Sequence, residues 1–206
     1  MEASDPDFRS GFVTLVGRPN AGKSTLVNAI MGKKIAITSN TVQTTRHRFR
    51  TVLTRDDYQL ILVDTPGLHK PHDALGEELN TSALKALEDV DVAAMLVDSS
   101  KPVGTGDEWV AAQLAHVRAK KVLVLSKIDL VDSERLAAQQ EAATKLAPWD
   151  AVVALSSETG AGVREFVDTV AGMLPPGPAW FPKDMETDQP LEVVIAEFVR
   201  EKILRT

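Results

Sequence analysis

The stretch GRPNAGKS, at positions 17–24, restricts the fold of this chain more than any other part of the sequence. It matches the phosphate-loop pattern G-x-x-x-x-G-K-S/T and lies between an apolar run, FVTLV, and a helix-like run, TLVNAIM. In such a loop, backbone N–H groups surround phosphate oxygens at a helix N-terminus, where the helix dipole favours negative charge. Gly17 and Gly22 would let the backbone approach the ligand closely. This context favours a nucleotide-binding loop over a chance match in an ordinary strand–helix turn.

The remaining chain alternates short β-branched runs with segments of helical period, the pattern of a parallel sheet covered by helices on both faces. The runs 49–54 and 59–63 are too close for a crossover helix, so they predict an antiparallel hairpin. We therefore expect an α/β fold, a P-loop NTPase with a mostly parallel six-stranded sheet flanked by helices. The predicted strands are 12–16, 49–54, 59–63, 92–97, 122–125 and 152–155, and the predicted helical faces are Leu75, Leu79, Ala83 and Leu87, then Val163, Phe166, Val167 and Val170.

Length and composition fit one such domain with a short appendage. The chain has 206 residues, a net charge of -6 and no cysteine, which argues against general nucleic-acid binding and excludes disulfides and thiolate chemistry. The first ten residues lack the apolar core of a signal peptide and predict a disordered segment, 1–10, in a cytoplasmic protein. A nucleotide-binding domain is expected over 11–174 and a proline-rich linker over 175–190. Helical spacing of Leu191, Val194, Ile195, Phe198 and Lys202 predicts an amphipathic helix over 191–206.

Candidate phosphate and metal residues follow from the loop and from a second motif, LILVDTPG at 60–67. Lys23 would reach the β- and γ-phosphates, and Ser24 would ligate Mg²⁺. Asp64 ends an apolar strand, where a carboxylate needs a cation, and a place beside Mg²⁺ through water satisfies it. Gly67 could then offer its N–H to the γ-phosphate. Alone, this motif is equally a strand-ending turn. The polar stretch between the motifs predicts a loop that orders when a threonine hydroxyl, from Thr44 or Thr45, coordinates Mg²⁺.

The choice of base rests on SKID, at 126–129. Guanine presents two adjacent donors that the Asp129 carboxylate can accept together, whereas adenine presents a lone pair there. Such a pocket can reject the wrong base by roughly 10⁴–10⁵-fold. Lys127 can lay its stem along the base, and Ser157 in ALSSETG can direct a backbone N–H at the guanine O6. Ser126 stands where an asparagine amide would tie this loop to the phosphate loop, so we expect a weaker grip that Ser126→Asn would tighten. In isolation, SKID is also compatible with an exposed strand end.

These motifs together, GRPNAGKS, QTTRH, DTPGLH, SKID and SSE, resemble the GTPase domain of the Era family of ribosome-assembly GTPases, over positions 11–206. The resemblance implies GTP/GDP and Mg²⁺ as ligands, slow GTP hydrolysis, and Thr45 rather than Thr44 at the metal. Leu68 occupies the position where Ras-like GTPases have the glutamine that orients the attacking water. Relatives with this substitution use the residue equivalent to Asn20 to hold K⁺, and the resemblance implies the same role for Asn20 as a hypothesis. The implied site is catalytic Lys23, Thr45 and Gly67, metal-binding Ser24, Thr45 and Asp64, and nucleotide-binding Gly17, Arg18, Pro19, Asn20, Ala21, Gly22, Lys23, Ser24, Thr25, Asp64, Thr65, Pro66, Gly67, Ser126, Lys127, Asp129, Ser156, Ser157 and Glu158.

Partners also follow from the resemblance. Residues 191–206 resemble the start of the KH RNA-binding domain of Era proteins, which we expect to be truncated here, so 16S rRNA and the 30S subunit are expected as partners, mainly through the missing part of that domain. Peripheral membrane association and a monomeric state are implied in the same way. The local basic group Arg46, His47, Arg48 and Arg50 is either a solvated loop or a contact to RNA phosphates. Two other functions stay open on sequence alone: a non-catalytic, nucleotide-gated module that binds RNA or a partner, and a P-loop ATPase or small-molecule kinase.

Overall fold

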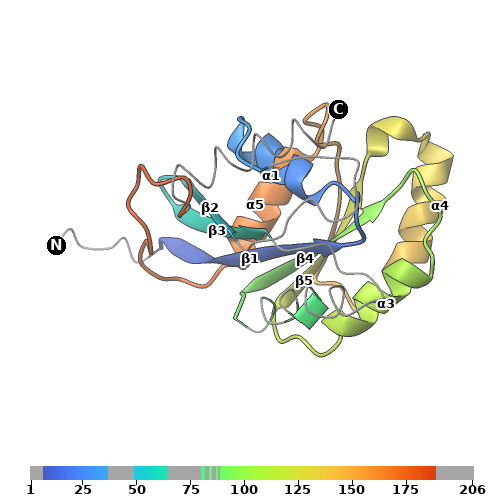
Figure 1. Ribbon diagram of the computed structural model, residues 1–206, viewed down its shortest axis with the longest axis horizontal. Helices are drawn as coiled ribbons and strands as arrows, with labels where there is room; N and C mark the ends of the chain where they lie inside the picture. The colour runs from blue at the N-terminus through green and yellow to red at the C-terminus, as the bar shows by residue number, and fades with distance from the viewer. Residues whose placement is uncertain are drawn as a thin grey trace.

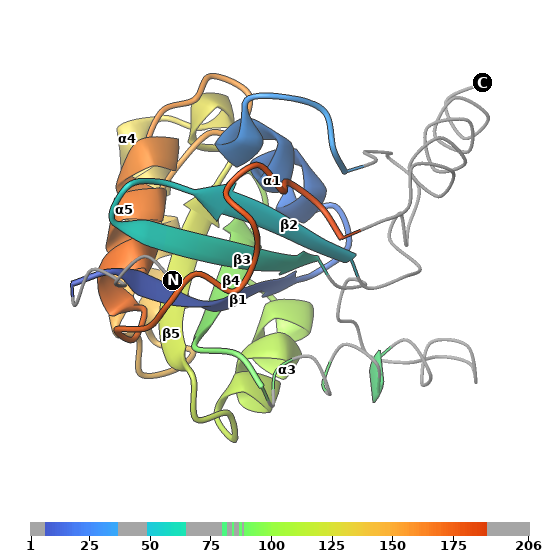
Figure 2. The ribbon, with the colours of Figure 1, turned by 90° about the vertical axis from the view of Figure 1, so that its left-hand side faces the viewer.

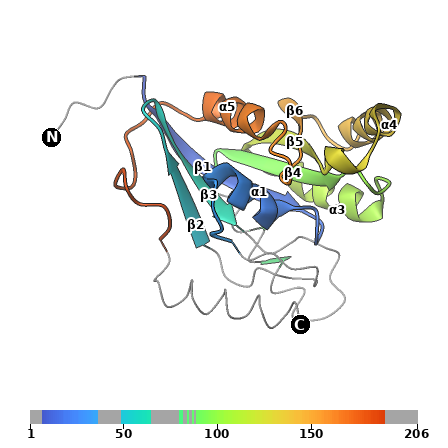
Figure 3. The ribbon, with the colours of Figure 1, turned by 90° about the horizontal axis from the view of Figure 1, so that it is seen from above.

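Six strands form one sheet in the computed structural model, which describes residues 7–36, 49–64, 80, 81, 84, 87 and 89–188. In this part of the chain the strand order is β2-β3-β1-β4-β5-β6, and every pair is parallel except β2 with β3 (Figures 1 and 3). The predicted fold class is therefore confirmed, hairpin included. The strands are β1 (Arg9–Gly17), β2 (Phe49–Thr54), β3 (Tyr58–Asp64), β4 (Val92–Asp98), β5 (Lys120–Ser126) and β6 (Ala151–Ala154).

Helices cover both faces of the sheet because successive side chains of each strand alternate between the faces. In β1, Val13 and Leu15 face the core under α1 (Lys23–Met31) and α5 (Val163–Met173), whereas Val16 joins the core on the opposite face. That second core packs against α3 (Thr105–Leu114) and α4 (Ser133–Thr144). Figure 1 shows α1 and α5 on one side of the sheet and α3 on the other. Because β3, β1, β4, β5 and β6 run parallel, their carboxyl ends and the loops that follow lie at one edge.

The helices differ in how far the sequence predicted them. Helix α5 buries Val163, Phe166, Val167 and Val170 as expected. The sequence pattern did not predict helix α3, because a buried aspartate, Asp107, interrupts the apolar face of the helix. Helix α4 was missed because it buries only Ala143, so it carries almost no stripe to detect. Of the helical face predicted from Leu75 to Leu87, Leu87 is helical and buried, while Leu75, Leu79 and Ala83 lie outside the described residues.

The proline-rich segment 175–188, which we call the strap, is attached to the sheet along its length. Its start meets β1, where Ser10 N donates to Pro175 O at 3.2 Å, and its end meets the free edge of β2, where Val52 N donates to Glu186 O at 2.9 Å. Figure 2 shows the strap crossing β3 and β2. The sheet also begins earlier than the predicted domain boundary, since β1 starts at Arg9. Residues 1–6 and 189–206, with the predicted amphipathic helix, lie outside the described residues.

Candidate nucleotide-binding site

The phosphate loop joins the end of β1 to the start of α1, as its motif predicts, and both of its glycines have positive φ angles. Gly17 has φ +145°, and a Cβ at this position would lie 2.6 Å from the carbonyl oxygen of Leu96 in β4. Gly22 caps α1 with φ 100°. Side chains are therefore excluded at Gly17 by close packing and disfavoured at Gly22 by backbone conformation. The result is a loop that enters α1 by its N-terminus, where an anion is favoured.

Lys23 lies within this loop rather than out in solvent. Its side chain is 8% exposed, and Nζ donates to the carbonyl oxygens of Gly17 and Arg18, each at 3.1 Å. The ammonium group therefore lies across the loop, in the position expected of a residue that meets phosphate oxygens. Asn20 is exposed, with φ 66°. Pro19, Ser24 and Thr25 complete the loop, with Ser24 in the first turn of α1.

The strand that carries Asp64 ends beside the phosphate loop. Asp64 is the last residue of β3 and pairs in register with Leu15, two positions before Gly17. This backbone position fits the predicted role at the metal. The structure does not describe the Asp64 side chain, and Thr45, Thr65, Pro66 and Gly67 lie outside the described residues. Their roles therefore stay predictions.

Ser126 does tie the base loop to the phosphate loop, so the sequence-based expectation of a lost tie is wrong. Its hydroxyl is buried, with the residue 2% exposed, and Oγ lies 2.8 Å from Ala21 O and 3.1 Å from Val97 O. A hydroxyl has a single proton to donate, and Ala21 O offers the shorter of the two contacts. A serine reaches this carbonyl directly because the phosphate loop lies against the end of β5.

Lys127 and Asp98 fix the next part of the base loop. Lys127 has φ 59°, and its Nζ lies 2.7 Å from Asp98 Oδ2 at the end of β4. Asp98 Oδ1 accepts hydrogen bonds from Ser100 N and Oγ, at 3.0 and 2.6 Å. Burial alone would raise the pKa of Asp98, but the hydrogen bonds from Lys127 and Ser100 outweigh it and lower this pKa below its ordinary value. The lysine side chain is thereby held between the ends of β4 and β5.

The third loop follows β6 and is closed by its own hydrogen bonds. Ser156 is fully buried; its N donates to Ala161 O at 2.8 Å, and its Oγ accepts from Thr159 N at 3.1 Å. Gly162 has φ +73°, and a Cβ there would lie 2.1 Å from Ala154 O. The buried Ser156 therefore shapes the loop, while Ser157 and Glu158 are left at its surface.

One cavity of about 260 Å³ joins all three loops. The residues that line it are Gly22 and Thr25 of the phosphate segment, Ser126, Lys127, Asp129 and Leu130 of the base loop, and Ser157 and Glu158 of the third loop. Asp129 is exposed, so its carboxylate is accessible to a ligand. Leu130, 62% exposed, was not predicted as part of the site; the signal in the sequence was its position directly after Asp129. Segments separated by about a hundred positions thus meet, as the base-and-phosphate hypothesis requires.

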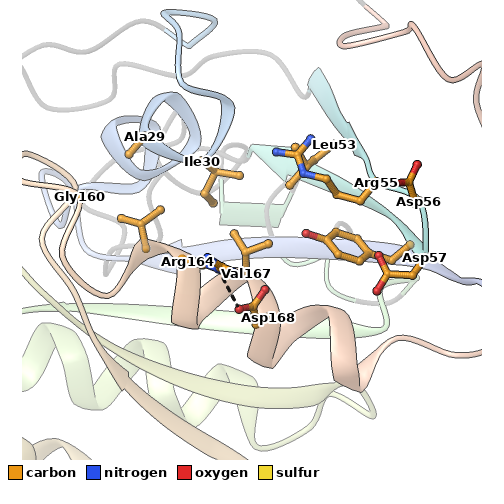
Figure 4. A pocket seen from close by; sticks show the side chains of 12 residues that line it. Ala29, Ile30, Leu53, Arg55, Asp56, Asp57, Gly160, Arg164, Val167 and Asp168 are labelled. Atoms are coloured by element: carbon orange, nitrogen blue, oxygen red, sulfur yellow. Dashed lines mark ion pairs between the residues drawn. The ribbon is translucent and has the colours of Figure 1, made fainter.

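A larger cavity, about 670 Å³, lies between α1, α5 and the β2–β3 turn (Figure 4). Its rim carries Arg55, Asp56, Asp57 and the ion-paired Arg164 and Asp168, 3.6 Å apart. None of the predicted nucleotide-binding residues is among those that line it. Size alone therefore does not identify the site, and we assign the smaller cavity because it contains the motif residues.

Comparison with known families supports this assignment. A family profile described as 50S ribosome-binding GTPase matches residues 12–127. A GTPase Era from Mycobacterium sp. (strain KMS) is 47% identical over 201 residues, which cover 96% of this chain and 67% of the relative. A GTPase Era from Clostridium botulinum (strain Alaska E43 / Type E3) is 45% identical over 198 residues, with the same shares covered.

Two solved structures agree with the fold and with these relatives. One is Era in complex with MgGDPNP and nucleotides 1506–1542 of 16S ribosomal RNA, with a TM-score of 0.89 and 34% identity, covering 95% of this chain and 67% of that one. The other is a single-residue variant of Aquifex aeolicus Era bound to GDP.AlF4-, with a TM-score of 0.86 and 33% identity over the same shares. Identity, coverage and the shared nucleotide motifs agree, and the chain belongs to the Era family of GTPases.

Proposed function

We propose that this chain binds GTP and GDP with Mg²⁺ in the three-loop cavity, hydrolyses GTP, and reports its nucleotide state to 16S ribosomal RNA during assembly of the small ribosomal subunit. The observation that carries the proposal is the meeting of Gly22, Ser126 and Asp129 around one cavity, with Lys23 held in the adjoining loop. A purine bound at Asp129 would extend its phosphates toward Lys23 and the N-terminus of α1. The relatives crystallised with guanine nucleotides support the same reading.

Magnesium is supported by the donors present. Ser24 lies at the N-terminus of α1, and Asp64 ends the strand next to β1, so a hydroxyl and a carboxylate come from adjacent segments of the same sheet edge. Hard cations such as Mg²⁺ take oxygen ligands of this kind. We assign Ser24, Asp64 and Thr45 to hold the ion, which when bound would neutralise charge on the β- and γ-phosphates.

The chain's own residues would stabilise transferred charge rather than form a covalent bond. Lys23 and the N–H groups of the phosphate loop would hold the triphosphate, and water would attack the γ-phosphate in line. Leu68 cannot orient this water, so we expect slow hydrolysis by the isolated chain. We propose that Asn20 helps to hold K⁺ near the transferred phosphoryl group, where it would supply positive charge. Equal GTP turnover in KCl and NaCl would contradict the K⁺ site alone.

Ribosomal RNA enters the proposal through the relative that was crystallised with a 16S rRNA fragment. We propose that RNA contacts are made mainly by a KH domain, of which residues 191–206 resemble only the start, and that the 30S subunit is the assembly partner. Peripheral membrane association and a monomeric state are carried from the family resemblance. Flotation with anionic lipid vesicles and light scattering would test these two points. In the described residues no helix is long and apolar enough to cross a membrane.

Multiple-turnover phosphate release tests the central proposal. We expect repeated turnover of GTP, no turnover of ATP, and a higher rate with 16S rRNA or 30S subunits. Lys23→Ala should lose tight nucleotide binding, whereas Lys33→Ala, which removes an exposed lysine paired with Glu186, should keep it. A single turnover without repetition would favour the nucleotide-gated binding module, and competition by ATP at equal concentration would favour an ATPase or kinase.

A further inference from the structure

Two side chains from other parts of the fold hold the phosphate loop, one near each end. Near its start, Arg18 Nε lies 2.9 Å from Asp107 Oδ1 in α3. Near its end, Ala21 O accepts the hydrogen bond from Ser126 Oγ at 2.8 Å. A phosphate loop acts through the directions of its backbone N–H groups, so contacts that fix both ends also fix the geometry of the site.

Asp107 is fully buried, which is rare for a carboxylate. One oxygen, Oδ2, accepts a hydrogen bond from Gly104 N at 3.1 Å and caps α3. The other oxygen, Oδ1, accepts no hydrogen bond within the described residues, and the Arg18 guanidinium lies against it. A buried charge is unfavourable unless a counter-charge meets it, so Arg18 is the partner that makes this aspartate tolerable.

Gly106 makes room for this contact. A Cβ at position 106 would lie 2.6 Å from Arg18 Cδ and 3.4 Å from Cγ. The arginine stem therefore lies flat on the first turn of α3, and its side chain, 30% exposed, extends toward α3 rather than freely into solvent. The side chain of Arg18 thus serves the loop by anchoring it, while its carbonyl oxygen meets Lys23 Nζ.

We propose that Asp107, acting through Arg18, is a positioning residue for the phosphates of the bound nucleotide, and that Ser126 is the second anchor of the same loop. This inference rests on the proposed nucleotide-binding function. A loop held at both ends before binding loses less conformational freedom when the ligand arrives, so affinity for the diphosphate rises. The contribution should be the same for every nucleotide that carries the same phosphates.

A double-mutant cycle tests the first anchor. Arg18→Met keeps much of the stem but leaves Asp107 buried without a counter-charge, and Asp107→Asn keeps an acceptor for the α3 cap. Arg18→Met should raise the Kd for GDP by about 10-fold, as expected when a charge-assisted contact is lost. The double variant should bind GDP more tightly than Arg18→Met alone, because no buried charge is left unpaired. Additive effects would contradict the pairing. Should Arg18→Met fail to fold, Asp107→Asn alone replaces it, because it removes the counter-charge of Arg18 and keeps an acceptor for the α3 cap, and an unchanged Kd would then count against the anchor.

Inosine diphosphate separates a positioning role from a merely structural one. It carries the same diphosphate as GDP and lacks only the 2-amino group, so loss of the Arg18–Asp107 anchor should weaken both ligands by the same factor. If Arg18→Met lowers the unfolding temperature of the ligand-free chain while both Kd values stay at the parent level well below that temperature, the proposal is overturned. Asp150→Asn is the matched control, because it breaks a 3.1 Å ion pair with Lys120 away from the cavity.

The second anchor is tested by Ser126→Ala and Ser126→Thr. Alanine removes the hydroxyl and should weaken GDP binding several-fold, roughly the effect of one buried hydrogen bond, whereas threonine keeps the hydroxyl and should restore part of the loss. Parent-like affinity of Ser126→Ala would remove Ser126 from the proposal. A parent chain that binds neither GDP nor GTP would instead refute the proposed function itself, and parent binding with unaffected variants would refute only the anchors.

Discussion

Single atoms decide what Ser126 can do, and they reverse the expectation drawn from the motif alone. Oγ already reaches Ala21 O at 2.8 Å, and the residue is 2% exposed. An asparagine is longer, so its side chain would have to displace the phosphate loop or adopt an unfavourable rotamer. Overpacking of this kind destabilises a site by about 1–3 kcal/mol. We therefore expect Ser126→Asn to bind GDP more weakly than the parent, by roughly 10-fold.

Titration with a fluorescent GDP analogue measures this change. Ser133→Asn is a suitable control, since it places the same side chain at an exposed position that does not line the cavity. Tighter binding by Ser126→Asn would restore the motif-based expectation and show that the base loop has room to spare. The motif could not reveal this because it fixes residue types, whereas the distance between two loops depends on the whole sheet.

At the scale of the elements, the ion pair between Lys127 and Asp98 connects the ends of β5 and β4. The lowered pKa of Asp98 means that the ionised carboxylate stabilises the folded chain. This stabilisation is present above the ordinary carboxyl value of 3.8 and is lost as pH falls through the lower folded-state value. Asp98→Asn should therefore destabilise the chain by roughly 2 kcal/mol near pH 6, and the difference should shrink toward pH 3.

Urea unfolding at both pH values gives this difference. Asp184→Asn removes an exposed carboxylate and controls for the change in net charge. A gap between parent and Asp98→Asn that widens on acidification would contradict the assignment.

The middle of the strap is bound by one buried glutamine in β3. Gln59 is fully buried; its Oε1 accepts from Trp180 N at 2.7 Å and from Phe181 N at 2.9 Å, and its Nε2 donates to Phe181 O at 2.8 Å. Gln59→Ala leaves these strap groups unpaired and should destabilise docking by roughly 2 kcal/mol. We expect faster tryptic cleavage after Lys183. Gln140→Ala, on the exposed face of α4, should leave the cleavage rate unchanged, and equal cleavage of both variants would contradict this role for Gln59.

Elements were predictable where their pattern reflects burial. The strand 49–54 was predicted with its observed bounds, because it is rich in β-branched and aromatic residues and three consecutive members, Thr51, Val52 and Leu53, are buried. Helix α4 carried no such pattern, and in α3 the buried Asp107 broke it. The docking of the strap could not be read from its prolines, since Gln59, its main partner, lies some 120 positions earlier. Long-range polar contacts of this kind leave no local periodicity.

At the scale of the molecule, the site is a junction between distant parts of one sheet. The phosphate loop follows β1, and the base and third loops follow β5 and β6, with β4 between them. Ser126 and the sheet already connect these loops to one another. A nucleotide that contacts all three loops would connect them further. Binding should therefore be linked to global stability, with unfolding free energy raised by about 2.7 kcal/mol when free GDP is at 100 times its Kd.

The role of Asp129 can be tested by comparing which nucleotide bases produce this stabilisation. In the parent chain, GDP should raise the unfolding temperature, and ADP at the same concentration should not, because adenine presents no adjacent pair of donors to the carboxylate. Asp129→Asn removes the acceptor pair, so GDP should lose its effect. Xanthosine diphosphate has a carbonyl oxygen in place of the 2-amino group and can accept from the new amide, so it should stabilise Asp129→Asn and not the parent. Thermal unfolding with each nucleotide measures this change in base preference.

Glu158→Gln, which changes another acidic residue of the same cavity, should keep the parent preference for GDP. If Asp129→Asn still responded to GDP as the parent does, the carboxylate would not read the base, and selectivity would have to come from the backbone of the third loop.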